Sequence, residues 1–267
     1  MLLAVVYAKS NGIPFRVIGN GSNLLFPDNG FNGIIIRTVK LRSITLENGL
    51  MRADCGVMLP RLCSLAAKNG LGGLHGLSGI PGTVGGAIAV SAGAYGCSIS
   101  DTLVSCRVLY TDTCEVQEKM LTPEAFSYRK GPFTDGMGRK AIILSALFKP
   151  FAEPSGDIER RIRFCRERRL ATQPYDQKSA GSYFLRPEPE LSAAGLIDQA
   201  GLKGFTVGGA SVSEKHAGFI VNNGFASCSD VLFLAQKVKE RVFSIFGILL
   251  SEEVIFVNNN TESSETV

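Results

Sequence analysis

The chain has 267 residues, of which 45% are hydrophobic and 19% are charged, so it is long enough and apolar enough to fold into two or three subdomains. Its net charge of +4 is too small to indicate a nucleic-acid surface, although it leaves anionic small molecules as partners. The seven cysteines form no Cys-x-x-Cys pair and no histidine lies at ligand spacing, which predicts neither a disulfide framework nor a metal site. This composition favours a globular protein of the reducing cytoplasm.

The first half of the chain predicts short strands, one helix and glycine-rich turns. The apolar start MLLAVVYAKS is too short to span a bilayer and is interpreted as part of the fold. PFRVIG (14–19) and GIIIRTV (33–39) have the β-branched character of strands. LPRLCSLAAKNG (59–70) places apolar residues at helical spacing, which predicts a helix. Further strands are predicted at LVSCRVLYT (103–111) and AIILSALFKP (141–150).

The second half predicts two longer helices after a junction at FAEPSGD (151–157). In the first of them, Ile158, Ile162 and Cys165 share one face and its arginines point elsewhere. The second runs from about residue 230 to residue 246 and ends at Gly247, before the strand EEVIFV. The residues predicted to point inward from this second helix are Val231, Ala235, Val238, Val242 and Ile245. The polar residues 258–267 are predicted to be a frayed tail.

Two glycine-rich segments, IGNGSNLL (18–25) and GIPGTVGGAI (79–88), are the main indication of a binding site. An isolated glycine is most often a surface turn, but this density favours loops whose backbone approaches a ligand and whose N–H groups hold phosphate oxygens. Leu24 stands where the third glycine of a dinucleotide fingerprint would be, and no Gly-Lys-Ser/Thr sequence follows either segment. A pyrophosphate would therefore be held by two separated loops without a Rossmann helix.

Seven segments resemble one enzyme family in order and spacing: VIGNGSNLLFPDNGFNGIIIR, GLSGIPGTVGGAIAVSAGAYG, YRKGPF, SAGSYFLRP, AGLIDQAGLKG, KHAGFIVN and LLSEEVIFV. The family is UDP-N-acetylenolpyruvoylglucosamine reductase, and the resemblance covers nearly the whole chain. It implies an α+β protein with a vanillyl-alcohol-oxidase-like (PCMH-type) FAD-binding fold of two subdomains, followed by a C-terminal α/β substrate-binding domain. The implied limits are 1–39 for the first subdomain, 40–150 for the second, 153–257 for the substrate-binding domain and 258–267 for the tail.

The resemblance also implies an activity. Enzymes of this family are cytoplasmic and use FAD and NADPH to reduce the enolpyruvyl ether of UDP-N-acetylglucosamine to UDP-N-acetylmuramate in peptidoglycan synthesis. The implied partners are the UDP-sugar and NADPH, with no nucleic acid and no membrane insertion, and the chain is expected to be a monomer. NADH in place of NADPH is not excluded by the sequence.

Three residues match the catalytic positions of the family. Addition of hydride to C3 of the enolpyruvyl group leaves an enolate that needs a nearby cation and a proton at C2. By resemblance, Ser182 is the proton donor, while Arg129 and Glu253 polarise the carboxylate and stabilise the developing enol. Each residue alone would be interpreted as a turn residue or a surface charge, so these roles depend on the shared register of the motifs.

The resemblance carries over further positions. The cofactor-binding residues that it implies are Gly19, Asn20, Gly21, Ser22, Asn23, Leu24, Ile80, Pro81, Gly82, Thr83, Gly85, Gly86, Ala87, Ser91, Gly93, Ala94 and Tyr95. The substrate-binding residues that it implies are Tyr128, Arg186, Lys215, His216 and Asn222. His75 and His216 are expected to be structural or to line the substrate site. The arginines at 160, 161, 163, 166, 168 and 169 form either a solvated helix face or, for one or two of them, a diphosphate contact.

The sequence also departs from the family pattern. The segment that usually precedes MLLAVVYAKSNGIPF is expected to be missing, either from the fold or through a start assigned too far downstream. Ser91 replaces an Asn, Gly131 stands where a Ser commonly occurs, and Thr172 stands where a Lys is frequent. Leu185 and Arg186 replace a Lys-Asn pair, so Arg186 is expected to restore charge toward a phosphate. The short connection before SAGS indicates the type of reductase that lacks a tyrosine-bearing closing loop.

Three alternatives remain from the sequence alone. Another FAD oxidoreductase of the same fold would keep the glycine loops but would not need AGSYF, Tyr128-Arg129 and EEV together. A catalytically degenerate flavin-binding protein is favoured by the short N-terminus and by Leu185. A nucleotide-sugar binder without flavin would be colourless.

Overall fold

The computed structural model describes residues 1–133 and 141–258, so all but the first residue of the predicted tail lies outside the described residues. The described chain forms two compact units. The first contains residues 1–20 and 32–168, and the second contains residues 21–31 and 169–258. The division between residues 168 and 169 falls inside a long helix, after the junction predicted at 151–157. The predicted subdomain limits stay a prediction.

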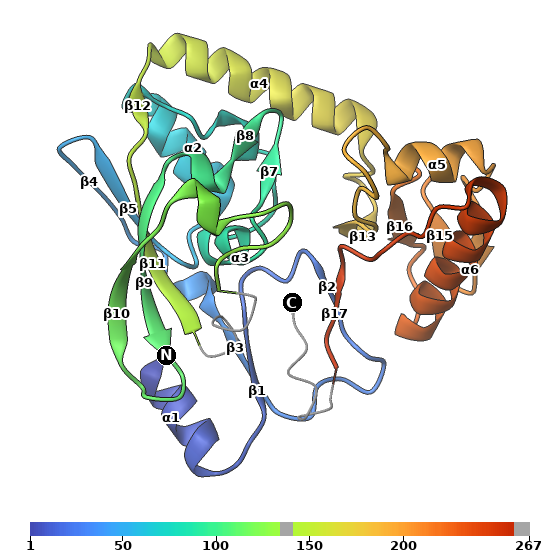
Figure 1. Cartoon of the computed structure of the whole chain (residues 1–267), viewed down its shortest axis with the longest axis horizontal. Helices are drawn as coiled ribbons and strands as arrows, with labels where there is room; N and C mark the ends of the chain where they lie inside the picture. Colours follow the sequence, from blue (N-terminus) through green and yellow to red (C-terminus); the bar gives the residue numbers. More distant parts are fainter. Residues whose placement is uncertain (134–140, 259–267) are drawn as a thin grey trace. The chain divides into compact units, whose positions relative to one another are not determined.

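The first unit carries four α-helices and most of the strands (Figure 1). Its helices are α1 (Leu2–Ser10), α2 (Leu59–Lys68), α3 (Val84–Ala89) and α4 (Ser155–Thr172), with short 3-10 turns η1 (Thr38–Lys40), η2 (His75–Leu77), η3 (Ile99–Asp101) and η4 (Pro123–Ala125). Its strands are β1 (Phe15–Ile18), β3 (Ile34–Arg37), β4 (Ile44–Glu47), β5 (Leu50–Asp54), β6 (Leu71–Gly72), β7 (Gly93–Ala94), β8 (Cys97–Ser98), β9 (Leu103–Tyr110), β10 (Val116–Met120), β11 (Ala141–Phe148) and β12 (Phe151–Ala152).

Two sheets organise this unit. Strands β1 and β3 form a parallel pair, and an antiparallel sheet of five strands runs in the order β10-β9-β11-β5-β4. The four strands and the helix predicted for residues 14–150 are confirmed, as β1, β3, β9, β11 and α2. Strands β4, β5 and β10 were not predicted. Strands β4 and β10 are mostly exposed, which leaves little apolar alternation in their sequences. Strand β5 has no exposed residue, and its five residues alternate between half-buried and buried.

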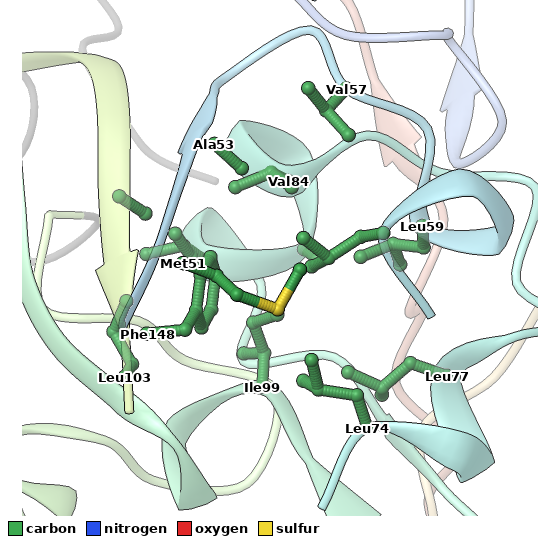
Figure 2. Close-up of a cluster of buried hydrophobic side chains, with 14 of the residues drawn as sticks. Met51, Ala53, Val57, Leu59, Leu74, Leu77, Val84, Ile99, Leu103 and Phe148 are labelled. Atoms are coloured by element: carbon green, nitrogen blue, oxygen red, sulfur yellow. The ribbon is translucent and has the colours of Figure 1, made fainter. Parts of the chain in front are cut away.

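The core of the first unit lies where α2 and α3 cover the five-stranded sheet. Figure 2 shows Met51 and Phe148, from strands β5 and β11, in one buried cluster with Val84 and Leu59, from helices α3 and α2. These side chains are fully buried, and each contributes about 1.5–3 kcal/mol of hydrophobic stabilisation. The apolar face predicted for helix α4 is also confirmed, because Ile158 and Cys165 are buried and Ile162 packs against this core.

The second unit is built on a small antiparallel sheet with two helices. The sheet runs in the order β13-β16-β15-β14, and a separate parallel pair joins β2 to β17. Its elements are β2 (Leu24–Leu25), β13 (Lys178–Ser182), α5 (Ala193–Gln199), β14 (Thr206–Val207), β15 (Ala210–Val212), β16 (Phe219–Asn222), α6 (Cys228–Phe246) and β17 (Ile255–Phe256). The strand predicted at 252–257 is therefore present only over two residues.

Most of the residues predicted to point inward from helix α6 do so, and one does not. Ala235, Val238 and Val242 are buried, and Gly247 ends the helix with a left-handed φ of 70°. The prediction that Ile245 points inward is wrong, because its side chain is 43% exposed. Phe246 packs against the core instead, since four residues from Val242 return closer to the same face than three.

None of the helices in residues 1–133 and 141–258 has the length and apolar character needed to cross a membrane. All seven cysteines are described, and all are free thiols.

Candidate active site

Residues 18–20 of the first glycine-rich loop meet the second loop within the first unit. The side-chain amide of Asn20 donates to the Pro81 carbonyl over 2.8 Å, across 61 residues of sequence, and Arg37 donates to the Asn20 side-chain oxygen over 3.1 Å. Gly19 faces Thr83 so closely that an added Cβ would lie 2.3 Å from the threonine Oγ1. The predicted juxtaposition of the two loops therefore has a packing basis.

The second loop runs into helix α3, which begins in the middle of the loop. Thr83 is buried and caps the helix, since its hydroxyl accepts from the Gly86 N–H over 3.3 Å. Gly85 donates to the Cys55 carbonyl, and its added Cβ would lie 2.9 Å from the Cys55 Cβ. At Gly86 the nearest atom to an added Cβ is the Thr83 Oγ1 at 3.4 Å, so the protein itself leaves room for a side chain there.

Two predicted cofactor residues occupy the left-handed region without being glycine. Ser91 has φ 47° and Tyr95 has φ 51°. Tyr95 and Gly96 connect β7 to β8, and their two positive φ values are those of a type I′ hairpin turn. A bulky residue rarely adopts this conformation, and such outliers are concentrated at functional sites.

Tyr128 and Arg129 lie at the tip of a tight turn closed by two main-chain hydrogen bonds of 3.0 Å between Ser127 and Lys130. Arg129 has φ 59°, and its guanidinium donates to the Gly93 carbonyl over 3.4 Å. The turn thus places this arginine beside the hairpin that follows the second glycine loop. Tyr128 is 51% exposed and lies against the Arg129 guanidinium, 5.3 Å from ring centroid to Cζ.

Gly131 fixes this turn to the end of helix α3. Its N–H donates to the Ala89 carbonyl over 3.1 Å, and an added Cβ would lie 2.0 Å from the Ile88 carbonyl oxygen. The departure from the more common serine therefore has a steric reason in this chain: any side chain at residue 131 would displace the turn that carries Arg129.

These features fit an FAD pyrophosphate held by main chain. Gly21 has φ 78° and no atom within 4 Å of an added Cβ, so its backbone is free of side-chain obstruction. Arg37 adds a positive charge next to Asn20. Such a pair of loops can approach an anionic group closely with N–H donors, which is the chemistry that a dinucleotide cofactor needs.

The second unit places Ser182 at a disturbed strand end. The pairing of β13 with β16 shifts register between Ser179 and Ser182, and Gly181 has φ 89° inside this bulge. A bulge redirects the following side chain, and Ser182 is partly exposed beyond it. The next residue, Tyr183, is buried, and burial raises the pKa of its phenol.

Glu253 lies beside this serine segment, and its neighbour Glu252 has a different role. The Glu253 N–H donates to the Tyr183 carbonyl over 2.8 Å. Glu253 is therefore bonded to the residue that directly follows Ser182. The Glu252 carboxylate instead pairs with Lys239 of helix α6 at 2.9 Å. Of these two glutamates, the family resemblance had selected Glu253 alone.

The predicted substrate residues all belong to local networks. Lys215 donates to the Leu170 carbonyl over 2.7 Å, and Arg186 donates to the Pro189 carbonyl over 3.2 Å. The Asn222 side-chain oxygen accepts from the N–H groups of Gly224 and Ala226 at 2.7 and 3.0 Å. Their contacts with substrate stay predictions.

The two histidines lie in packed surroundings. Burial lowers the pKa of His216, whose Nδ1 accepts from the Gly218 N–H over 3.2 Å and whose ring packs edge-on against Phe219. Burial also lowers the pKa of His75, whose ring lies 3.5 Å from the Cys97 sulfur. Both rings are therefore neutral at pH values near 7, which suits structural residues better than proton donors.

Two longer-range contacts were not anticipated from the sequence. Asn23 was predicted only as a cofactor residue, yet its side chain donates to the Glu253 carbonyl over 3.0 Å. Asp28 accepts from the first N–H groups of helix α6, at Cys228 and Ser229. Residues 21–31 are part of the second unit, although residues 21–25 belong to the first glycine-rich segment.

Comparison with known proteins identifies the two parts of the chain. Residues 2–118 match a family described as an FAD binding domain, and residues 173–257 match the C-terminal domain of UDP-N-acetylenolpyruvoylglucosamine reductase. A UDP-N-acetylenolpyruvoylglucosamine reductase of Carboxydothermus hydrogenoformans is 42% identical over 253 residues, which cover 94% of this chain and 82% of that protein. The corresponding reductase of Caldicellulosiruptor bescii is 42% identical over 253 residues, covering 94% of this chain and 79% of that protein.

A solved structure agrees with these relatives. The crystal structure of the reductase from Thermus caldophilus matches with a TM-score of 0.80 and 34% identity, covering 94% of this chain and 88% of that chain. The predicted α+β fold, with an FAD-binding part followed by the C-terminal domain of this reductase family, is confirmed. The chain belongs to the UDP-N-acetylenolpyruvoylglucosamine reductase family and is an FAD-dependent oxidoreductase of peptidoglycan synthesis.

Proposed function

We propose that Ser182, Arg129 and Glu253 carry the reduction of the enolpyruvyl ether of UDP-N-acetylglucosamine to the lactyl ether of UDP-N-acetylmuramate. The observation that carries the proposal is the hydrogen bond from the Glu253 N–H to the Tyr183 carbonyl, which fixes Glu253 next to the residue that follows Ser182. Arg129 contributes from the first unit, on a turn tied to the predicted cofactor loops. The family membership supports NADPH as the reductant.

The residues divide the chemistry as the substrate requires. When bound, FAD supplies the transfer of two electrons from NADPH to the enolpyruvyl carbon. The Arg129 guanidinium stabilises the negative charge that develops on the substrate carboxylate and enolate, and Glu253 polarises the same group. The Ser182 hydroxyl donates a proton to C2, and the resulting alkoxide is neutralised by a proton from solvent. The product has gained two electrons and two protons.

The main chain is proposed to hold the cofactor through both glycine loops. Gly19 to Leu24, Ile80 to Thr83 and Gly85 to Ala87 are the proposed contacts of the pyrophosphate, with Ser91, Gly93, Ala94 and Tyr95 near the flavin. Tyr128, Arg186, Lys215, His216 and Asn222 are the proposed substrate contacts. Apart from Tyr128, these belong to the second unit, in agreement with the match to a reductase C-terminal domain.

A single-turnover experiment tests this function. The purified chain, loaded with FAD, should lose its yellow colour when NADPH is added anaerobically. UDP-N-acetylglucosamine enolpyruvate should restore the colour and yield one equivalent of UDP-N-acetylmuramate by mass spectrometry. Bleaching without recovery by substrate would instead identify a catalytically degenerate flavin protein.

We further propose that the chain works as a monomer in the cytoplasm. The proposed catalytic and cofactor residues all lie on one chain, and seven free thiols suit a reducing compartment. Light scattering on the FAD-loaded protein should give the mass of one chain, 28.6 kDa plus cofactor. A mass of two chains would reject the monomer.

A further inference from the structure

The main chain of Glu253 is held on both sides. Its N–H donates to the Tyr183 carbonyl over 2.8 Å, and its carbonyl accepts from the Asn23 side-chain amide over 3.0 Å. The Asn23 carbonyl accepts in turn from the Ile255 N–H, also over 3.0 Å. Asn23 thus bonds the chain on either side of Val254 and restricts the backbone that carries Glu253.

The Asn23 side chain adds a bond that strand pairing does not supply. The parallel pair of β2 and β17 joins Leu24 and Leu25 to Ile255 and Phe256 through main chain alone. The side-chain bond lies beyond the end of this pair, at Glu253, where the strand has not yet begun. The side-chain amide of Asn23 supplies the donor that this carbonyl accepts, whereas a carboxylate of the same shape accepts and cannot donate.

The segment that carries Asn23 is itself anchored at its other end. The Asp28 carboxylate accepts from the N–H groups of Cys228 and Ser229 and from the Ser229 hydroxyl. A charge-assisted bond to a helix N-terminus is among the stronger contacts available to an exposed carboxylate. Asn23 is therefore attached to a segment fixed within the second unit, which allows its side chain to hold Glu253 in place.

We propose that Asn23 is a positioning residue, which acts on the reduction of substrate by fixing the backbone and hence the side-chain direction of Glu253. The proposal deepens the proposed function and rests on the role given there to Glu253. A catalytic group displaced by about 1 Å can lose about 100-fold in rate, so one lost hydrogen bond at this point can have a large kinetic effect.

The substitution Asn23→Asp tests the proposal, because it keeps the shape and removes the donor. FAD content and the rate of flavin reduction by NADPH should stay unchanged, because the cofactor contact proposed for Asn23 is made by its main chain, while reoxidation by substrate slows by about 10- to 100-fold at saturating substrate. Asn69→Asp is the matched control: the Asn69 amide makes a similar bond to the Leu65 carbonyl over 2.8 Å, on helix α2. It should leave both half-reactions unchanged. Asn23→Ser keeps a donor on a shorter side chain, so its rate of reoxidation should fall less than that of Asn23→Asp. If Asn23→Asp does not fold, Asn23→Ser is the variant that is measured.

A double-mutant cycle with Glu253→Ala separates the possible results. If Asn23 acts through Glu253, Asn23→Asp should cause no further loss in the Glu253→Ala background. If the fold-losses in reoxidation rate of the two single variants multiply in the double variant, or if Asn23→Asp loses bound FAD, then Asn23 acts directly on substrate or cofactor. Either result would overturn the proposal. A slow Glu253→Ala with a normal Asn23→Asp would overturn the positioning role alone. A normal Glu253→Ala would reject the role of Glu253 itself, and the positioning role with it.

Discussion

Single residues in this chain owe their roles to contacts that are distant in the sequence. Glu252 and Glu253 are adjacent and identical, yet one pairs with Lys239 and the other is held by Asn23 and Tyr183. Within residues 1–133 and 141–258, five residues other than glycine have a positive φ, and they include Arg129, Ser91 and Tyr95, which the sequence had already selected as site residues. Backbone strain and predicted function thus coincide at the same positions.

The two glutamates give a matched prediction at this scale. Glu253→Gln should slow reoxidation of the flavin by substrate about 100-fold or more, because it replaces the carboxyl group that is proposed to polarise the developing enol. Glu252→Gln should leave that rate unchanged and lower stability by no more than about 1 kcal/mol, since it breaks an exposed ion pair. Stopped-flow absorbance and thermal unfolding measure the two effects. Equal rates for the two variants would contradict the assignment of Glu253.

At the scale of elements, the glycine loops show that one residue type serves several purposes. Gly19 and Gly131 are required by neighbouring protein atoms, at Thr83 and Ile88, and Gly85 is required by Cys55. Gly86 differs because the protein leaves space at its Cβ position. Its lack of a side chain is therefore best explained by a ligand, and this makes Gly86 the most informative glycine of the loop.

Substitution of Gly86 should separate cofactor binding from folding. Gly86→Val should fold but retain little FAD, because the branched side chain would occupy the space that the proposed pyrophosphate needs. Gly85→Val should instead lower the melting temperature of the apoprotein, since its Cβ would meet Cys55. The ratio of flavin to protein absorbance and the apoprotein melting temperature check both outcomes. Full flavin content in Gly86→Val would remove this glycine from the site.

The start of helix α6 carries a pH dependence of stability. The Cys228 N–H holds the pKa of Asp28 below its usual 3.8, and the Ser227 N–H does the same for Asp230. A carboxyl whose pKa is lower in the folded state stabilises the fold above its unfolded pKa, and this contribution is lost as the pH falls through the folded pKa.

Asp28→Asn should therefore be less stable than the parent chain near neutral pH, and the difference should shrink between about pH 5 and about pH 2. Asp176→Asn, at an exposed carboxylate of the same unit, is the control and should follow the parent at every pH. Urea unfolding across this pH range provides the measurement. A constant difference between Asp28→Asn and the parent would argue against a charge-dependent anchor.

At the scale of the whole molecule, the chain divides into a unit with Gly19, Asn20, the second glycine loop and Arg129, and a unit with residues 21–24 of the first loop, Ser182 and Glu253. The longer elements and the family could be predicted from local patterns and from motifs in register. The strands β14, β15 and β16 could not, because segments of two to four residues leave too little alternation to read. The bond between Asn23 and Glu253 spans 230 residues, and no local pattern encodes it. Ile245 was assigned inward because residues spaced by three and by four both lie near the same helix face, and the sequence offers Ile245 and Phe246 at these two spacings from Val242.

The most direct test of the catalytic assignment compares the two half-reactions of Ser182→Ala by anaerobic stopped-flow. Reduction of the flavin by NADPH does not involve protonation of the enolpyruvyl group, so in Ser182→Ala it should proceed at close to the rate of the parent chain. Reoxidation by UDP-N-acetylglucosamine enolpyruvate requires a proton at C2, so it should slow by about 100-fold or more, and Ser182→Cys should recover part of this rate because a thiol can also donate a proton. Equal slowing of both half-reactions in Ser182→Ala, or an unchanged rate of reoxidation, would show that Ser182 is not the proton donor.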